Sequence, residues 1–245
     1  MRVSKRTQMN VDEDNPYWMS FSDVMSALLI IFILAAVILI VQLMELEENA
    51  LNELNRADLV RREILNEAKE QLELRGIRVT VSQNDTVLSI PNDTLGFGTA
   101  EYLIGESFVP IALQIGEVLS QVIREDDRID YLDTVFVEGH TDIRRLSRSS
   151  MNMDNWGLSA FRAISLWQLW EESLPEEITL NSLMNLDDQL LFSVSGYGPS
   201  RPVTEAQVTE EQFRENRRID IRFTIRRPDR EQIESLFRRT EPGAQ

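Results

Sequence analysis

The sequence of 245 residues predicts an α+β protein: a single amino-terminal transmembrane helix, a helical linker, and a two-layer α/β sandwich with a β-α-β-α-β core. Three observations predict this class. An apolar run with one carboxylate fills residues 17–43, apolar residues recur at helical spacing through residues 44–76, and segments of strand and helix periodicity alternate through residues 77–227. Residues 1–16 and 228–245 are expected to form a cytoplasmic tail and a carboxyl-terminal tail that includes a helix.

The apolar run from Tyr17 to Leu43 is long enough to cross a bilayer. From Val24 to Val41 every residue except Ser26 is apolar, and these positions rise about 27 Å in a helix. Basic residues precede the run and acidic residues follow it, at Arg2, Lys5 and Arg6 and at Glu45, Glu47 and Glu48. This bias predicts a cytoplasmic amino terminus, and the length of the apolar core favours a retained anchor over a cleaved signal peptide.

Asp23 is the one carboxylate in this run. An ionised group at the bilayer centre costs roughly 2.5 to 3.5 kcal/mol, so such a group usually faces a partner or a water-filled path. In one interpretation Asp23 takes up and releases a proton; in the other it caps the helix together with Ser20 and Ser22. Tyr17 and Trp18 suit the membrane interface and put Asp23 more than one turn deeper than Tyr17, which favours the first interpretation.

Composition excludes several classes of function. A formal net charge of −16 argues against direct nucleic-acid binding, which requires clustered basic residues. The absence of cysteine removes thiolate metal sites and thiol chemistry, and one histidine, His140, cannot build a metal site alone. Without a nucleophile motif, a nucleotide loop or a metal cluster, the chain is not expected to be an enzyme or to need a cofactor.

The linker at residues 44–76 is expected to be one helix that continues the membrane helix, because Pro and Gly are absent until Gly76. Its apolar residues form one stripe: Leu43, Leu46, Ala50, Leu54, Ala57, Val60, Ile64, Ala68 and Leu72. The stripe packs either on the helix's own domain or on its copy in a second chain, and we favour a paired, dimerising helix.

The domain at residues 77–227 is expected to be built from a hairpin and then alternating helices and strands. In order, the pattern predicts a hairpin of residues 77–83 and 86–90 around Asn84-Asp85, a helix over Phe108–Ile123, a strand over Thr134–Glu138, a helix over Leu158–Trp170, a strand over Leu190–Ser195 and a closing strand over Asn216–Ile225. The acidic connection from Glu172 to Asp188 is expected to be solvated, and Asp229–Arg239 to form a terminal helix.

Four motifs in this domain occur in the order GHTD (139–142), NWGLSAFRA (155–163), GYGPSRP (196–202) and NRRIDI (216–221). Together they resemble the peptidoglycan-binding domain shared by OmpA and the flagellar stator protein MotB. The resemblance implies that Asp142 and Arg162 grip the charged centres of a diaminopimelate peptide, and that Asn155 and Leu158 lie beside that ligand. The loop after Asp142 carries an Arg/Ser-rich insertion, with Arg145 where the OmpA pattern has Gly; MotB-type members have a comparably long loop.

The residues alone leave other interpretations open. Asp142 and Arg162 could form an internal salt bridge that ties loop to helix. Arg217 and Arg218 are interpreted as a structural strand end at the surface, and His140 as a hydrogen-bonding residue of the turn.

The membrane segment WMSFSDVMSALLIIF (18–32) resembles the MotB-type segment whose Asp carries the ion, and LSIPNDTLGFGTAEYL (88–103) resembles ZorB, the MotB-like subunit family of Zorya anti-phage systems. These resemblances imply a peptidoglycan-anchored stator subunit of a proton-driven motor in the bacterial inner membrane, with its carboxyl-terminal domain in the periplasm. The implied partners are a second copy of the chain, a ring of five MotA-like (ZorA-like) subunits around the two copies, and cytoplasmic defence effectors. The alternatives are a flagellar MotB-type stator subunit and a passive peptidoglycan tether.

Overall fold

The computed structural model describes residues 16–82, 84–98, 100–145 and 154–227. Its described residues divide into two compact units, residues 16–51 and residues 52–227. The expected tail before Pro16 and the expected helix after residue 227 lie outside the described residues.

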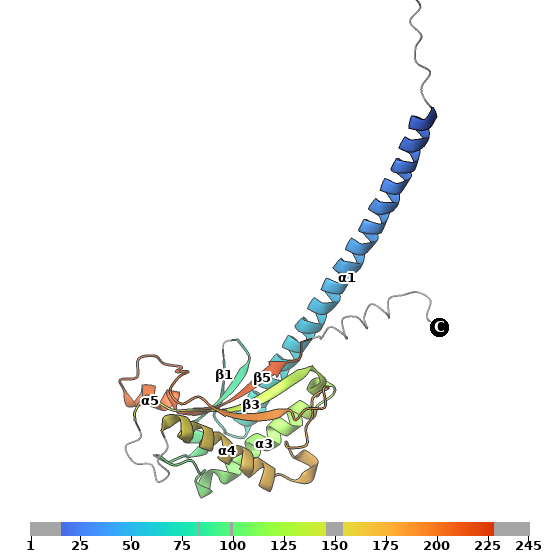
Figure 1. Cartoon of the computed structure of the whole chain (residues 1–245). Coiled ribbons are helices and arrows are strands. Elements are labelled where there is room, and N and C mark those ends of the chain that lie inside the picture. Colours follow the sequence, from blue (N-terminus) through green and yellow to red (C-terminus); the bar gives the residue numbers. More distant parts are fainter. Residues whose placement is uncertain (1–15, 83, 99, 146–153, 228–245) are drawn as a thin grey trace, which may run out of the picture. The chain divides into compact units, whose positions relative to one another are not determined.

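The described part of the first unit belongs to α1 (Pro16–Leu74), a continuous helix that contains the apolar run (Figure 1). From Phe21 to Glu45 every side chain is exposed except that of Ala36, which is half-buried. By length and composition this helix is able to cross a membrane. A surface this apolar requires a cover, which a bilayer or other protein surfaces supply.

The second unit is built on a five-stranded sheet in the order β1-β2-β5-β3-β4 (Figure 1). Its strands are β1 (Thr80–Val81), β2 (Val87–Pro91), β3 (Leu132–His140), β4 (Phe192–Gly196) and β5 (Arg218–Ile225). β3 and β4 are parallel, and every other neighbouring pair is antiparallel. The central strand is therefore β5, which comes last in the described chain and joins the hairpin β1-β2 to the β3-β4 pair.

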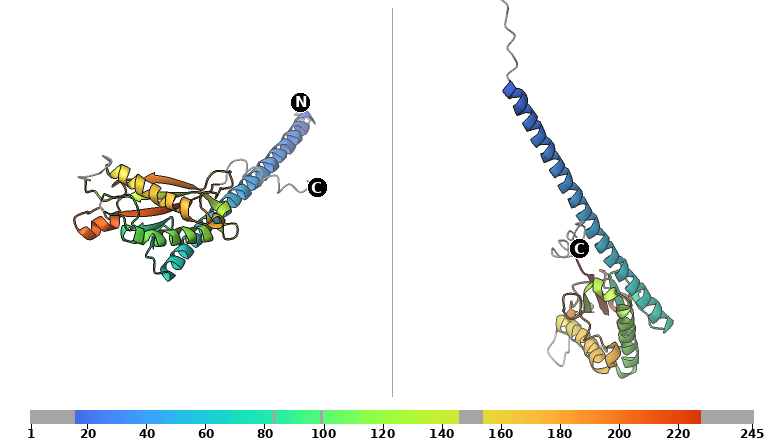
Figure 2. Two further views of the ribbon diagram at one scale, coloured as in Figure 1. Left: turned by 90° about the horizontal axis from the view of Figure 1, so that it is seen from below. Right: turned by 90° about the vertical axis from the view of Figure 1, so that its right-hand side faces the viewer.

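Helices α3 (Val109–Arg124) and α4 (Asn155–Ser173) cover one face of the sheet (Figures 1 and 2). The end of α1 joins this layer beside α3, where Glu67 pairs with Arg128 at 2.8 Å and Arg75 with Glu117 at 3.2 Å. The short helices α2 (Asn92–Leu95) and α5 (Glu210–Asn216) and three 3-10 turns, Glu106–Phe108, Arg128–Tyr131 and Glu176–Ile178, complete the unit.

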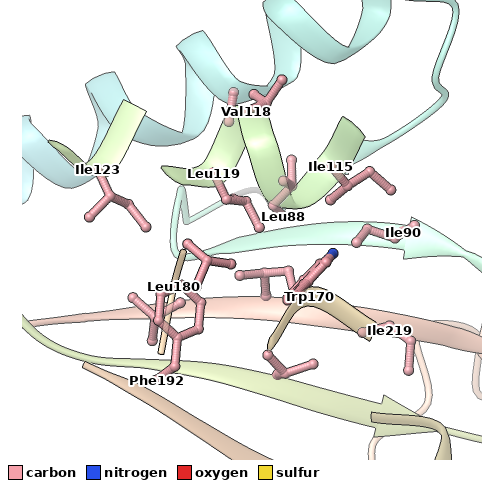
Figure 3. Packing of buried hydrophobic residues seen from close by; sticks show 14 of the residues in the cluster. Leu88, Ile90, Ile115, Val118, Leu119, Ile123, Trp170, Leu180, Phe192 and Ile219 are labelled. Atoms are coloured by element: carbon pink, nitrogen blue, oxygen red, sulfur yellow. The ribbon is translucent and has the colours of Figure 1, made fainter. Parts of the chain in front are cut away.

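The hydrophobic core lies between the sheet and this helical layer (Figure 3). Alternate residues of β5 enter it, as the period of two requires, and Val135 and Val137 of β3 do the same after a register shift that follows Leu132. Trp170 is fully buried at its centre, and its indole nitrogen donates to the carbonyl of Ala112 at 2.7 Å. Gly116 makes room for the ring, because a Cβ there would lie 2.7 Å from Trp170 Cδ1. A methyl group at this position would separate α3 from α4.

The apolar stripe of α1 was expected to pack either on the helix's own domain or on a second copy, and its two parts differ in this respect. The lower part, toward the carboxyl end of the helix, is buried in its own domain, where Ile64, Ala68 and Leu72 are inaccessible to solvent, as is the neighbouring Leu65. The upper part, from Leu43 to Leu54, is more accessible to solvent, since Leu43 is exposed and Leu46, Ala50 and Leu54 are half-buried. Pairing with a second copy stays a prediction for this upper part only.

The predicted α/β sandwich is confirmed, with α3, α4 and all five strands at the expected places. Three expectations were wrong in detail. β1 is only two residues long, because the Ser82 hydroxyl accepts hydrogen bonds from the backbone of Thr86 and Val87 and closes the turn early. The acidic connection is not simply solvated, since Leu180 and Leu183 are buried in the core (Figure 3). His140 is the buried last residue of β3 and does not lie in a turn.

Candidate functional site: an arginine-rich pocket at the end of β3

An open pocket of about 590 Å³ lies where β3 ends and α4 begins. All four residues predicted to bind peptidoglycan line it: Asp142, Asn155, Leu158 and Arg162. The remaining lining residues come from the segment after β2, from the loop after β3, from α5 and from the residue that follows α5: Asn92, Phe97, Gly98, Ala100, Thr141, Arg144, Arg145, Glu210 and Arg217.

Local sequence signals bring β3 and α4 together at this pocket. The Asp154 side chain accepts hydrogen bonds from the backbone of Trp156 and Gly157, both at 3.0 Å, and so fixes the start of α4. Gly139 lets the helix approach the strand, because a Cβ there would lie 1.9 Å from the carbonyl oxygen of Ser159. Asp142, just beyond β3, and Arg162, two turns into α4, therefore reach the same cavity.

Asp142 is buried and receives several donors. Its Oδ2 accepts from Arg217 at 2.6 Å and from the Arg144 guanidinium at 2.8 and 3.2 Å, and its Oδ1 accepts from the Arg144 backbone at 3.0 Å. Burial alone would raise the pKa of Asp142, but the hydrogen bonds from Arg144 and Arg217 outweigh it, and the pKa lies below its usual value. Asp142 is thus a fixed negative charge at neutral pH.

Arg162 is also buried, and its position is set by backbone carbonyls. Its Nε donates to Glu101 O at 2.8 Å and one terminal nitrogen donates to Gly98 O at 2.9 Å. Burial, with a smaller contribution from the charge of Arg217, lowers the pKa of Arg162 to about 10, so the group stays protonated at neutral pH. Among the described residues Arg162 has no carboxylate partner, and the alternative of an Asp142–Arg162 salt bridge is not formed.

Asn155 and Leu158 shape the pocket wall. The Asn155 amide donates to the carbonyls of Asp142 at 3.1 Å and of Arg144 at 3.0 Å, and so holds the loop in place. Leu158 is buried and supplies an apolar side.

Three residues that form one ion-pair network with Asp142 were not predicted as functional: Arg144, Glu210 and Arg217. Arg217, interpreted from the sequence as a structural strand end, contacts Asp142 directly. Glu210 lies on α5, which the sequence analysis did not expect, although the capping-box pair Thr209 and Gln212 signals that helix. Arg144 lies in the Arg/Ser-rich insertion. The sequence of this insertion does not indicate which of its arginines contacts Asp142.

The pocket carries an excess of positive charge although the chain is strongly acidic. Four arginines line it, Arg144, Arg145, Arg162 and Arg217, against the two carboxylates of Asp142 and Glu210. A ligand with more carboxylates than ammonium groups fits this balance best.

Beneath the site, a buried ion-pair network supports β3 and β5. His140 lies between two carboxylates, with its Nε2 at 3.2 Å from Asp220 and 3.9 Å from Glu138. Glu138 is held by two 2.9 Å hydrogen bonds from Arg222, and Asp220 by Arg218 at 2.9 Å. A ring nitrogen of His140 and carboxylate oxygens of Glu138 and Asp220 lie close enough together to bind one metal ion. The guanidinium groups already neutralise the carboxylates, so the arrangement is that of an ion-pair network.

Asp23, the predicted proton carrier, lies within α1 and well past its first turn. The helix begins at Pro16, and Asp23 comes seven residues later, about two turns along. A helix cap must lie at the terminus, so this position does not suit the capping interpretation. Ser26, one turn on, donates its hydroxyl to the carbonyl of Ser22 at 2.7 Å.

Comparisons with solved structures concern the α/β domain. A MotB-like protein from Desulfovibrio vulgaris superposes with a TM-score of 0.51 at 18% identity, over 70% of this chain and 98% of that chain. The periplasmic domain of Helicobacter pylori MotB gives 0.47 at 20% identity, over 67% and 94%. The T6SS cell wall anchor from Pseudomonas aeruginosa gives 0.48 at 24% identity, over 67% and 99%.

No protein-family model and no curated protein matches the chain. At 18% identity, the similarity to the Desulfovibrio protein shows that the domain has a MotB-like fold. What the pocket binds must be argued from its own residues.

Proposed function

We propose that this chain is a peptidoglycan-anchored stator subunit of a proton-driven inner-membrane motor. The observation that carries the anchoring part is the pocket that holds Asp142 and Arg162 as buried, opposite and mutually unpaired charges. A diaminopimelate side chain ends in an ammonium and a carboxylate, which are complementary to these two groups. The MotB-like fold of the domain supports the same function.

The hydrogen-bond donors that remain on Arg162 support its proposed role in binding the ligand carboxylate. Two of its nitrogens are used by backbone carbonyls, which leaves the other terminal nitrogen for a ligand. Asp142 keeps lone pairs on Oδ1, which accepts only one backbone hydrogen bond from the described residues. An ammonium that binds there gains a charge-assisted hydrogen bond in a partly desolvated site.

The motor part of the proposal relies on Asp23 and the apolar helix. Two copies pair through α1, and a ring of five MotA-like subunits surrounds them in the membrane. Each protonation of Asp23 removes a charge from the interface with the ring, so the neutral and ionised forms favour different contacts. Alternation between the two copies then steps the ring around the wall-anchored pair.

The sequence similarity to the ZorB family supports a role in anti-phage defence, with a ZorA-like ring that signals to cytoplasmic effectors. A flagellar MotB-type stator subunit is the second candidate, and a passive tether is the third. Neighbouring genes separate the first two, since nuclease or helicase genes beside a large MotA homologue favour defence and motility genes favour the flagellum.

The anchoring proposal is tested by binding to isolated sacculi. Asp142→Asn keeps the side-chain shape but removes the charge, so sacculus binding should fall about 10- to 100-fold, from the roughly 1.5–3 kcal/mol of a hydrogen bond to a charged group. The matched control is Asp187→Asn, which removes an exposed carboxylate paired with Arg226. Equal binding by both variants, with unchanged circular dichroism, would contradict the anchoring function.

The motor proposal is tested by Asp23→Asn in cells that contain the ring partner. The amide preserves size and hydrogen bonding but fixes the site in a neutral state, so the complex should assemble at normal abundance and lose all phage protection, or motility in the flagellar case. Glu53→Gln, a change on α1 beyond the apolar run, should remain active. Full activity of Asp23→Asn would leave the passive tether as the better proposal.

A further inference from the structure

The Glu210 carboxylate forms ion pairs with two arginines of the pocket, Arg144 and Arg217. It accepts from Arg144 at 2.8 Å and 3.4 Å and from Arg217 at 3.0 Å. These are the same two arginines that hold Asp142, so each guanidinium bridges two carboxylates. One carboxylate of each bridge is buried and one is open to solvent.

The two carboxylates differ in how firmly they are held. The side chain of Asp142 is 8% exposed and accepts an additional backbone hydrogen bond, whereas that of Glu210 is 57% exposed. Exposed ion pairs contribute little to stability, because water solvates both partners almost as well. Glu210 is therefore the carboxylate that an incoming anion can replace at low cost.

The surrounding structure stays in place without Glu210. Helix α5 is capped by Thr209 and Gln212, whose side chains bond each other's backbone and do not involve Glu210. The Arg144 guanidinium lies over the ring of Phe213, 4.2 Å from its centroid. Rotation of the Glu210 side chain thus frees two pre-positioned guanidinium groups.

We propose that Arg144 and Arg217 form a second carboxylate subsite, which Glu210 occupies until a stem peptide displaces it. This proposal rests on the proposed peptidoglycan binding. In a stem peptide the γ-linked glutamate precedes the diamino acid, and its α-carboxylate is free because the chain continues through the γ-carboxyl group. That α-carboxylate takes the place of the Glu210 carboxylate, while the diamino acid binds Asp142 and Arg162. The excess of arginines over carboxylates in the pocket accommodates the added charge.

The test measures the affinity of detergent-solubilised full-length chain for two soluble peptides by calorimetry. One is L-alanyl-γ-D-glutamyl-diaminopimelate, and the other carries an amide in place of the glutamate α-carboxylate. Glu210→Gln should bind the acid form about three- to tenfold more tightly than wild type, because the ligand no longer competes with an internal carboxylate. For the amidated peptide the change should stay below about twofold, since only screened long-range charge differs.

The matched control is Glu211→Gln, the neighbouring carboxylate in the first turn of α5, which forms no ion pair with the described residues. It should bind both peptides as wild type does, and thermal melts should show both variants folded alike. Equal affinities of Glu210→Gln and Glu211→Gln for the acid peptide, or an equal gain for both peptides, would overturn the second subsite. Peptidoglycan binding itself stands in that case if Asp142→Asn still loses the peptide. Failure of wild type to bind either peptide would overturn both proposals.

Discussion

Arg144 and Arg217 keep Asp142 ionised in a place where burial alone would favour the neutral acid. A ligand ammonium that reaches Asp142 meets a carboxylate whose charge and orientation are already fixed. The site is therefore organised before ligand binding, and the ordering cost falls on the ligand.

The same contacts make folding stability depend on pH. The pKa of Asp142 is lower in the folded protein than in the unfolded chain, where it is about 3.9. The ionised form therefore stabilises the fold above that value, and the contribution is lost as the pH falls through the folded pKa. Asp142→Asn should melt at a lower temperature than wild type at pH 7, and the two melting curves should converge below about pH 4. A difference that is constant from pH 7 to pH 3 would show that Asp142 does not contribute through its charge.

At the scale of single residues, sequence resemblance located four of the thirteen residues that line the pocket. Asp142, Asn155, Leu158 and Arg162 could be found because the motifs that contain them, GHTD (139–142) and NWGLSAFRA (155–163), resemble the OmpA and MotB pattern. Arg217 could not be separated from its neighbour Arg218 by pattern alone, although one lines the pocket and the other pairs with Asp220 beneath it. A difference of one position at the start of a strand reverses the face on which a side chain lies.

Among the secondary-structure elements, the contact between α4 and the sheet sets the geometry of the site. Gly139 of β3 and Gly196 of β4 lie against the backbone of α4, where a Cβ would come within 1.9 Å of Ser159 O and 2.4 Å of Ala160 N. The helix that carries Arg162 thus rests directly on the two strands whose ends surround the pocket. Distances across the site depend on this close approach.

Gly139→Ala should therefore destabilise the domain and weaken sacculus binding together. The added methyl group overlaps a backbone oxygen that cannot move alone, and such overpacking typically costs about 1–3 kcal/mol. Chemical denaturation of the variant measures the loss of stability. Gly105→Ala serves as the control, because its backbone has an ordinary φ of −62° and the nearest atom to an added Cβ lies at 3.4 Å. Unchanged stability of Gly139→Ala would contradict this account of the helix–sheet contact.

The elements that periodicity predicted are those whose periodicity is strong, such as α3, β3 and β5. The elements it missed are short: α2 and α5 have too few residues to show a period, and only a capping signal marks α5. The burial of Leu180 and Leu183 depends on the space left in the core, where Leu180 lies near Phe192 (Figure 3), and no local pattern encodes that space. The stripe on α1 was visible in the sequence, but what covers each part of it was not.

On the scale of the whole molecule, the proposed pairing of two copies uses the upper part of the α1 stripe. The chain has no cysteine, so a single introduced thiol reports on one position. Ala50→Cys, on the stripe, should form a disulfide between copies in membranes, whereas Asn52→Cys, about 200° around the helix, should form far less. Equal yields at the two positions would mean that the copies do not pair through this face.

The central position of β5 governs when the domain can fold during biosynthesis. Until residues 218–225 have left the ribosome, the hairpin β1-β2 and the β3-β4 pair have no strand between them, and their inner edges stay unpaired. Folding of the α/β domain is then a late event that follows synthesis of β5, with the half-built sheet open to chaperones and proteases in the interval. A prematurely terminated chain would lack the central strand, so only chains that extend through β5 can complete the sheet.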